Sequence, residues 1–433
     1  MSVDTLRALL AGRCPDPDGP GMLAVPTRSV VIAPGLARDA GSLVGALGLG
    51  RRLAVVSDAI THEVLGAAIA RAVASIAEVI LAVLPAGVHG DAAAVEDVRG
   101  ATRRADGLIA VGSGTLNDLC KYAAALDRKP YAVFGTAPSM NGYTSVSAAI
   151  TVDGLKRSLP AVAARGVFLD VDVLARAPAR LIRAGLGDSL CRPTAQADWL
   201  LAHLLHDQPY REAPFALLAE EEDALLDAPE ALIARDPEAI ARLARVLVLS
   251  GFGMTICGGS YPASQGEHLI SHYADMRPPP GAPASYHGEQ IGVTTLTMAR
   301  LQERVLAGPA PRLGPVGVDD AALVRHFGAE LGRSCWVEFA PKRVDPGSAE
   351  RVNARLASAW EGWRRRLAAV GRPAARLADV LRRAGAPTEP EALGWPRPYY
   401  RDAVIHARLI RNRYTFLDLA ADAGMLEAFA AGL

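Results

Sequence analysis

The stretch G-L-I-A-V-G-S-G-T-L-N-D, residues 107–118, joins an apolar run to a glycine-rich turn and then to a helical pattern. Further apolar runs of this kind lie at 29–33, 52–57, 78–84, 130–134 and 166–170. Most are continuously apolar, which is typical of strands buried on both faces of a parallel sheet. Helical patterns rich in alanine and leucine separate them, as at 60–74 and 91–104. The alternation predicts a doubly wound α/β domain over residues 1–178.

Beyond residue 178 the strand signals fade and helical periods take over. The clearest helical segments are 180–186, 195–205, 239–250 and 286–306. The segment R-P-P-P-G-A-P-A-S at 277–285 must be a loop, because proline removes hydrogen-bond donors and blocks helix continuation. We predict an all-helical second domain over residues 179–433.

The composition describes a globular protein. The chain has 433 residues, half of them apolar, and a net charge of zero, so neither nucleic acid nor an anionic membrane is an expected partner. We find no signal peptide pattern and no run approaching eighteen apolar residues. The five cysteines are widely spaced and form no C-x-x-C pair, which fits a reducing cytoplasm and disfavours a thiolate metal site or a disulfide framework.

The turn at 112–116 has the features of a phosphate-binding loop. Gly112 and Gly114 would let backbone N–H groups approach a phosphate, and the following helix N-terminus favours its charge. Asn117 stands where a full G-x-G-x-x-G has its third glycine, so an ordinary strand-to-helix turn is the alternative. Asp58 follows the run 52–57, where it could bind an adenosine ribose and favour NAD over NADP, or could cap a helix.

Two further segments carry polar side chains. T-A-P-S-M-N-G-Y-T-S at 136–145 follows a strand, where open α/β sheets bind ligands, although by itself the segment is better interpreted as an ordinary loop. Asp188, His268, His272 and His287 are ligand-type residues, and two of them, His268 and His272, are four apart and so share a helix face. A carboxylate with two or three imidazoles suits one divalent metal ion with an open position. Single histidines are more often structural, and spacing leaves open which three of the four would bind.

Together these segments resemble the glycerol-1-phosphate dehydrogenase family, bacterial branch, within the larger group of glycerol dehydrogenases, iron-type alcohol dehydrogenases and 3-dehydroquinate synthases. The other matching segments are D-G-L-K (153–156), A-G-L-G-D-S-L-C-R-P-T-A-Q-A-D-W (184–199), P-A-S-Q-G-E-H-L-I-S-H (262–272), H-G-E (287–289) and I-R-N-R-Y-T-F-L-D-L-A (410–420). The resemblance covers nearly the whole chain. It implies an N-terminal NAD(P) domain, a helical C-terminal domain, and a zinc, nickel or iron ion in the cleft between them.

The resemblance also implies individual roles. Asp188, His268 and His287 correspond to the metal ligands, and His272 to a substrate contact that could relay a proton. The corresponding dinucleotide contacts are Asp58, Gly112, Ser113, Gly114, Thr115, Leu116, Thr136, Ser139, Ser145 and Lys156.

Several substrate-facing positions depart from the family. Asn141 stands where the family usually has an aspartate that touches a substrate hydroxyl. Tyr261 stands where an arginine usually holds a phosphate, and this loss of a cation weakens the case for a phosphorylated substrate. Cys191 and Arg192 replace a Gly-Lys pair, so Arg192 could restore a positive charge.

We therefore predict a metal-dependent, NAD(P)-linked dehydrogenase that interconverts a polar secondary alcohol and its ketone, foremost sn-glycerol 1-phosphate and dihydroxyacetone phosphate, in a homodimer or larger homo-oligomer. The main alternative is a dehydrogenase for a different alcohol or aldehyde, which Asn141 and Tyr261 favour. A sugar-phosphate cyclase needs several cations, and the chain has only four lysines. A non-catalytic nucleotide-binding homologue would not need the metal-ligand set.

Overall fold

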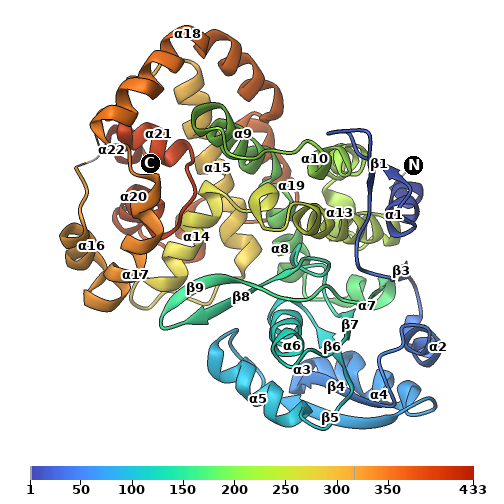
Figure 1. Cartoon of the computed structure of the whole chain (residues 1–433). Helices are drawn as coiled ribbons and strands as arrows, with labels where there is room; N and C mark the ends of the chain where they lie inside the picture. Colours follow the sequence, from blue (N-terminus) through green and yellow to red (C-terminus); the bar gives the residue numbers. More distant parts are fainter. Residues whose placement is uncertain (1, 316) are drawn as a thin grey trace. The chain divides into compact units, whose positions relative to one another are not determined.

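The structure of the protein is a computed structural model that describes residues 2–315 and 317–433 (Figure 1). The chain forms two compact units. The first unit takes in the described residues up to Val152, Lys156–Ser189 and Arg211–Ser260, and the second takes in Asp153–Leu155, Leu190–Tyr210 and Tyr261–Leu433. The chain therefore contributes several separate segments to each unit, and the single boundary predicted at residue 178 stays a prediction.

A six-stranded parallel sheet lies in the first unit. Its strands, in spatial order, are β3 (Ser29–Ala33), β10 (Gly166–Asp170), β7 (Tyr131–Gly135), β6 (Gly107–Gly112), β4 (Arg52–Asp58) and β5 (Glu78–Leu84). All six predicted strands are confirmed to within one residue at each end. Strands β6, β7 and β10 are buried along their whole length, which explains their continuously apolar sequence.

Helices alternate with these strands, as predicted for a doubly wound α/β fold. The helices of the first unit are α1 (Ser2–Leu10), α2 (Ala40–Gly45), α3 (Ala59–Thr61), α4 (Ala67–Val73), α5 (Ala92–Thr102), α6 (Gly114–Leu126), α7 (Val171–Arg176), α8 (Ala179–Ser189), α10 (Ala213–Ala216), α11 (Ala219–Asp227), α12 (Glu230–Ile233) and α13 (Pro237–Ile256). The predicted helical stretch 60–74 contains a π-helical turn, His62–Gly66, between α3 and α4.

The apolar helix α13 is the one helix among the described residues that is long and apolar enough to cross a membrane. Within its most apolar window, 72% of the residues are buried inside the protein. Core helices of globular proteins meet the same length and hydropathy limits, so α13 gives no support for a membrane span.

A hairpin that the sequence analysis did not predict follows the sheet strand β7. Its strands are β8 (Ser147–Val152) and β9 (Leu155–Pro160). Asp153 and Gly154 have φ values of 52° and 75°, so both residues of the turn adopt the left-handed conformation. Asp-Gly is a favoured pair for such a two-residue hairpin turn. The hairpin places Lys156 on β9, directly after this turn.

After β10 the described residues contain helices and no further strand, which confirms the predicted helical C-terminal part. The helices of the second unit are α9 (Arg192–His206), α14 (Gly266–Met276), α15 (His287–Leu306), α16 (Asp320–Phe327), α17 (Ala329–Phe339), α18 (Pro346–Val370), α19 (Ala374–Arg383), α20 (Arg397–His406), α21 (Phe416–Asp422) and α22 (Leu426–Ala431). The Pro-rich segment 277–285 is the predicted loop, between α14 and α15.

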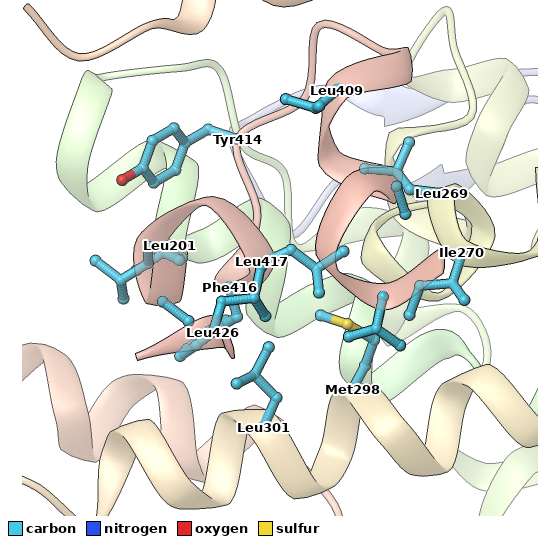
Figure 2. Close-up of a cluster of buried hydrophobic side chains, with 14 of the residues drawn as sticks. Leu201, Leu269, Ile270, Met298, Leu301, Leu409, Tyr414, Phe416, Leu417 and Leu426 are labelled. Carbon is cyan, nitrogen blue, oxygen red and sulfur yellow. The ribbon is translucent and has the colours of Figure 1, made fainter. Parts of the chain in front are cut away.

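Figure 2 shows part of the apolar core of the second unit. Leu201 comes from α9, Leu269 from α14, Leu301 from α15 and Phe416 from α21. The helices α14 and α15, which carry the three histidines singled out above, are thus held by core packing on both sides of the loop that joins them.

The helix α8 includes the predicted helical segment 180–186 and continues through Asp188, so A-G-L-G-D lies inside the helix. A Cβ atom at Gly185 would stand 1.7 Å from the main-chain oxygen of Pro138. Glycine at this position therefore lets α8 approach the segment 136–145 at backbone contact distance, which brings Asp188 to that segment.

We expect Gly185→Ala to destabilise the first unit by about 1–3 kcal/mol, since the methyl group would force α8 away from Pro138. The shift of the urea unfolding midpoint measures this loss. Gly100→Ala is the matched control, because Gly100 lies in α5 and its Cβ would meet nothing within 4 Å. The control should gain about 0.5–1 kcal/mol from helix propensity. Equal midpoints for the two variants would contradict the packing argument.

Candidate functional site

The predicted phosphate-binding turn lies at the carboxyl end of β6. A Cβ atom at Gly112 would stand 2.3 Å from Cδ1 of Leu116, so only glycine allows this tight entry into α6. Helix α6 begins at Gly114, and Thr115 in its first turn is exposed to solvent. The amide groups at the start of α6 are therefore placed where an anion can reach them.

Asp58 ends β4, the strand that pairs with β6. Its Oδ1 accepts hydrogen bonds from N (2.7 Å) and Oγ1 (2.9 Å) of Thr61, and its own N–H donates to Thr61 Oγ1 at 3.0 Å. Asp58 is thus the N-cap of α3, which confirms the structural interpretation of this residue. Its role at a ribose stays a prediction.

Lys121 is a buried residue of α6 whose importance the sequence analysis missed. Its Nζ donates to Gly142 O at 2.7 Å, to Ser145 Oγ at 2.9 Å and to Ser147 O at 2.9 Å. Burial lowers the pKa of Lys121, and the charge of Asp118, 3.2 Å away, partly offsets this effect. Lys121 therefore ties α6 to the end of the segment 136–145. The one sequence feature that could have drawn attention to Lys121 is the scarcity of lysine in this chain.

Three of the predicted dinucleotide contacts lie in that segment, and all three are buried. Thr136 donates its N–H to Gly112 O at 3.1 Å, so it lies beside the turn at 112–116. The hydroxyl of Ser145 accepts from Lys121 and lies 3.1 Å from Gly142 O, which ties it to the protein itself. The dinucleotide roles of Thr136, Ser139 and Ser145 stay predictions.

Asn141 and Asp188 meet within the first unit. The N–H of Asn141 donates to Oδ2 of Asp188 at 2.8 Å, and Asp188 is 1% exposed. The side-chain nitrogen of Asn141 is buried and has no hydrogen-bond partner in the part of the chain that the structure describes. A buried amide donor without a protein acceptor is costly, so this atom is suited to receive a polar ligand.

The three histidines of α14 and α15 come together within the second unit. The ring centroids of His268 and His287 are 5.1 Å apart, those of His268 and His272 are 5.9 Å apart, and those of His272 and His287 are 6.0 Å apart. His268 and His272 are buried and share one face of α14, as their spacing predicts. Folding thus gathers residues that a Pro-rich loop separates in sequence.

Glu267 orients one of these rings and was not predicted. Its fully buried carboxylate accepts from His268 Nδ1 through Oε1 at 2.9 Å, and the same oxygen accepts from Gln265 N at 2.7 Å. With Nδ1 engaged, Nε2 is the nitrogen of His268 that can act as a ligand. His287 has a similar contact, because Ser271 Oγ lies 3.5 Å from its Nδ1.

Tyr261 lies under an arginine from the C-terminal part of the chain. The guanidinium of Arg413 stands 4.9 Å from the centroid of the Tyr261 ring, and the ring stacks on Trp199 at 5.8 Å. Burial, and then the charge of Arg411, lower the pKa of Arg413 to about 9. A cation is therefore present beside the position where the family resemblance led us to expect one. The sequence feature that could have revealed Arg413 is the segment I-R-N-R-Y-T (410–415), which the sequence analysis used only as evidence of the family resemblance.

Arg192, the other candidate cation, begins α9. Its Nη1 donates to Gln196 Oε1 at 3.3 Å, one turn further along the helix. The neighbouring Cys191 is buried, and its thiol contacts Ala263 O at 3.6 Å. Arg192 as a substrate contact stays a prediction.

Comparisons with known proteins bear on the family and the fold of the chain. Residues 31–178 match the family model described as iron-containing alcohol dehydrogenase. A glycerol-1-phosphate dehydrogenase (NAD(P)+) from Bacillus licheniformis is 28% identical over 87% of this chain and 84% of its own. The enzyme of that name from Geobacillus stearothermophilus is 30% identical over 72% of this chain and 70% of its own. The crystal structure of a probable glycerol dehydrogenase from Sinorhizobium meliloti has a TM-score of 0.63 at 18% identity, covering 94% of this chain and 98% of that one.

The fold class is thus that of the iron-containing alcohol dehydrogenases, with a parallel sheet followed by a helical part. Within that class, the chain belongs to the glycerol-1-phosphate dehydrogenase family. The resemblance predicted from the motifs is confirmed, and so is the class of enzyme, an oxidoreductase of CH–OH groups.

We expect Lys121→Met to destabilise the first unit by about 3–5 kcal/mol, because it leaves the carboxylate of Asp118 and several main-chain oxygens without their buried cation. Urea unfolding measures the loss. Lys129→Met is the matched control: Lys129 is less buried, donates to Thr102 O at 2.8 Å, and should cost about 1 kcal/mol. If both variants lose the same stability, Lys121 has no special role in holding the segment 136–145.

Proposed function

We propose that this chain is a metal-dependent, NAD(P)-linked dehydrogenase that interconverts sn-glycerol 1-phosphate and dihydroxyacetone phosphate. The observation that carries the proposal is the group of His268, His272 and His287, with His268 oriented by the buried Glu267, in a member of the glycerol-1-phosphate dehydrogenase family. Ligand histidines typically engage their second ring nitrogen with a carboxylate or another hydrogen-bond partner in this way.

The residues proposed to hold one divalent ion are Asp188, His268 and His287. Two imidazoles and a carboxylate suit zinc, nickel or iron, and this choice of ligands does not select one of them. When bound, the ion would lower the pKa of the substrate hydroxyl and stabilise the developing alkoxide, while the nicotinamide would accept the hydride. His272 lies beside both histidine ligands and is proposed to take the hydroxyl proton, directly or through a water molecule.

The dinucleotide is proposed to bind along the carboxyl ends of β4, β6 and β7. The turn Gly112–Leu116 would hold the pyrophosphate, with Thr136, Ser139 and Ser145 beside it and Lys156 near the nicotinamide. The steric fit of Gly112 against Leu116 and the N-terminus of α6 support this assignment. An acidic residue at the end of β4, Asp58, favours NAD over NADP because it would repel a 2′-phosphate.

The substrate is proposed to be held by one amide and one guanidinium. The buried nitrogen of Asn141, which has no partner among the described residues, would donate to a substrate hydroxyl. Arg413 would receive the phosphate, in place of the arginine that Tyr261 replaces. Its guanidinium is desolvated and lies near a second one, Arg411, so a nearby anion would stabilise both charges.

A dehydrogenase for a different, non-phosphorylated alcohol is the second candidate. The substitution of Asn141 and Tyr261 for the expected aspartate and arginine favours it. The two candidates differ in whether a phosphate on the substrate contributes to catalytic efficiency.

We expect purified protein supplied with a divalent ion and NADH to reduce dihydroxyacetone phosphate, measured by NADH absorbance. Asp188→Asn should lower kcat/KM on the order of 100-fold or more, because Lewis-acid stabilisation is worth several kcal/mol. Asp97→Asn is the control, since Asp97 is an exposed residue of α5. Wild-type protein that reduces neither this substrate nor any of a broad panel of ketones and aldehydes would overturn the proposal.

We expect Arg413→Met to lower kcat/KM for dihydroxyacetone phosphate about 10–100-fold, because a hydrogen bond to a charged group is worth about 1.5–3 kcal/mol. The kcat/KM for dihydroxyacetone, which has no phosphate, should change little and serves as the internal control for folding. Arg413→Lys keeps the positive charge and should fall between. An equal loss on both substrates would mean that Arg413 supports the structure rather than the phosphate.

A further inference from the structure

A second group of metal-ligating side chains lies in the second unit. His326 is in the last turn of α16, and Asp402 and His406 are on α20. One ligand atom from each of these three residues lies within 4.8 Å of the other two. Asp402 and His406 are four residues apart, so they face the same side of α20.

The two histidine side chains lie against the carboxylate of Asp402. His406 Nδ1 is 3.0 Å from Asp402 Oδ1, and His326 Nε2 is 3.9 Å from Asp402 Oδ2. The two imidazole rings stack, with centroids 3.8 Å apart and an interplanar angle of 16°. One nitrogen of each ring therefore lies near the same carboxylate, and His406 Nδ1 also contacts the main-chain oxygen of Asp402 at 2.9 Å.

Tyr273, from α14, orients two of these residues from the buried side. Its hydroxyl donates to Asp402 Oδ2 at 2.7 Å and lies 2.9 Å from His326 Nε2. Burial and the neighbouring Asp402 raise the pKa of Tyr273, so it remains a hydrogen-bond donor. Orientation of a ligand carboxylate by an outer hydrogen bond is a regular feature of metal sites.

The opposite side of the group is open to solvent. The side chains of His326, His406 and Asp402 are 20%, 28% and 46% exposed, so an ion could enter without unfolding the helices. Arg277 lies close to the group: it donates to the main-chain oxygen of His326 and lies over the ring of Phe327 at 5.9 Å.

We propose that His326, Asp402 and His406 bind one divalent transition-metal ion, independently of the proposed catalytic site. Two imidazoles and one carboxylate suit Zn²⁺, Co²⁺ or Ni²⁺, whereas Mg²⁺ and Ca²⁺ prefer oxygen ligands. Three protein ligands leave a position for water. The bound ion would link α16 to α20, and through Tyr273 to α14, the helix that carries His268 and His272.

Titration of the metal-free full-length protein with Co²⁺ tests the proposal, because the visible absorption of the bound ion gives both stoichiometry and ligand environment. We expect the double variant His326→Gln, His406→Gln to bind one ion fewer per chain than wild type, and its thermal midpoint to lose the shift that the second ion gives wild type. His89→Gln, at an exposed histidine of the first unit, is the control and should bind as many ions as wild type.

The variant His268→Gln, His287→Gln separates this site from the catalytic one. If His326, Asp402 and His406 bind metal, this variant keeps one bound ion per chain, whether or not the wild type is active. A variant that combines all four substitutions loses that ion. The proposal is overturned if His326→Gln, His406→Gln binds as many ions as wild type while circular dichroism shows it folded. A loss that Asp402→Asn does not reproduce would also overturn it, since the carboxylate is the point on which both rings converge.

Discussion

A single buried carboxylate binds the first residue of α14, the helix that carries His268 and His272. Asp198, on α9, accepts the N–H of Gly266 through Oδ2 at 2.9 Å and the N–H of Phe416 through Oδ1 at 2.9 Å. It thereby joins the first turn of α14 to the start of α21, two segments far apart in sequence. Burial, and then the charge of Glu267, raise the pKa of Asp198, so the arrangement depends on these backbone donors. Because α14 starts at this anchor, His268 and His272 have a defined position relative to the core in Figure 2.

The first unit uses a buried charge of the opposite sign for a similar purpose. Lys121 donates hydrogen bonds to main-chain oxygens of the segment that follows β7. In the same way, Asp198 accepts a hydrogen bond from a main-chain N–H group at the start of α14. A buried charge is expensive unless its hydrogen bonds are complete, and here most of the hydrogen-bond partners are backbone groups at loops or at the first residues of helices. In the first unit this anchor holds the segment 136–145, and in the second unit it holds the first turn of α14, the helix that carries His268 and His272.

The sequence predicted the parts of this protein that depend on local pattern. The inner strands β6, β7 and β10 are apolar runs because they are buried along their whole length, and His268 and His272 share a face because α14 is regular. What it missed depends on tertiary contact. Nothing local distinguishes Glu267 as the partner of His268, Lys121 as the anchor of a distant segment, or Gly185 as the point where α8 closely approaches Pro138. The Asp-Gly turn of the β8–β9 hairpin was readable from sequence, but its flanking strands lack clear alternation.

The departures from the family pattern take on a different meaning in the light of Arg413. Read from sequence, Tyr261 removes a cation from the substrate side of the site. In the structure the guanidinium of Arg413 lies 4.9 Å from the centroid of the Tyr261 ring, a contact that an arginine at position 261 would replace with repulsion between two positive charges. The two positions are therefore coupled, and under the proposed role of Arg413 the tyrosine supports a cation rather than removing one. Restoring the family's arginine at position 261 alone should for that reason impair this chain, and only a joint change at both positions can return it to the family's arrangement.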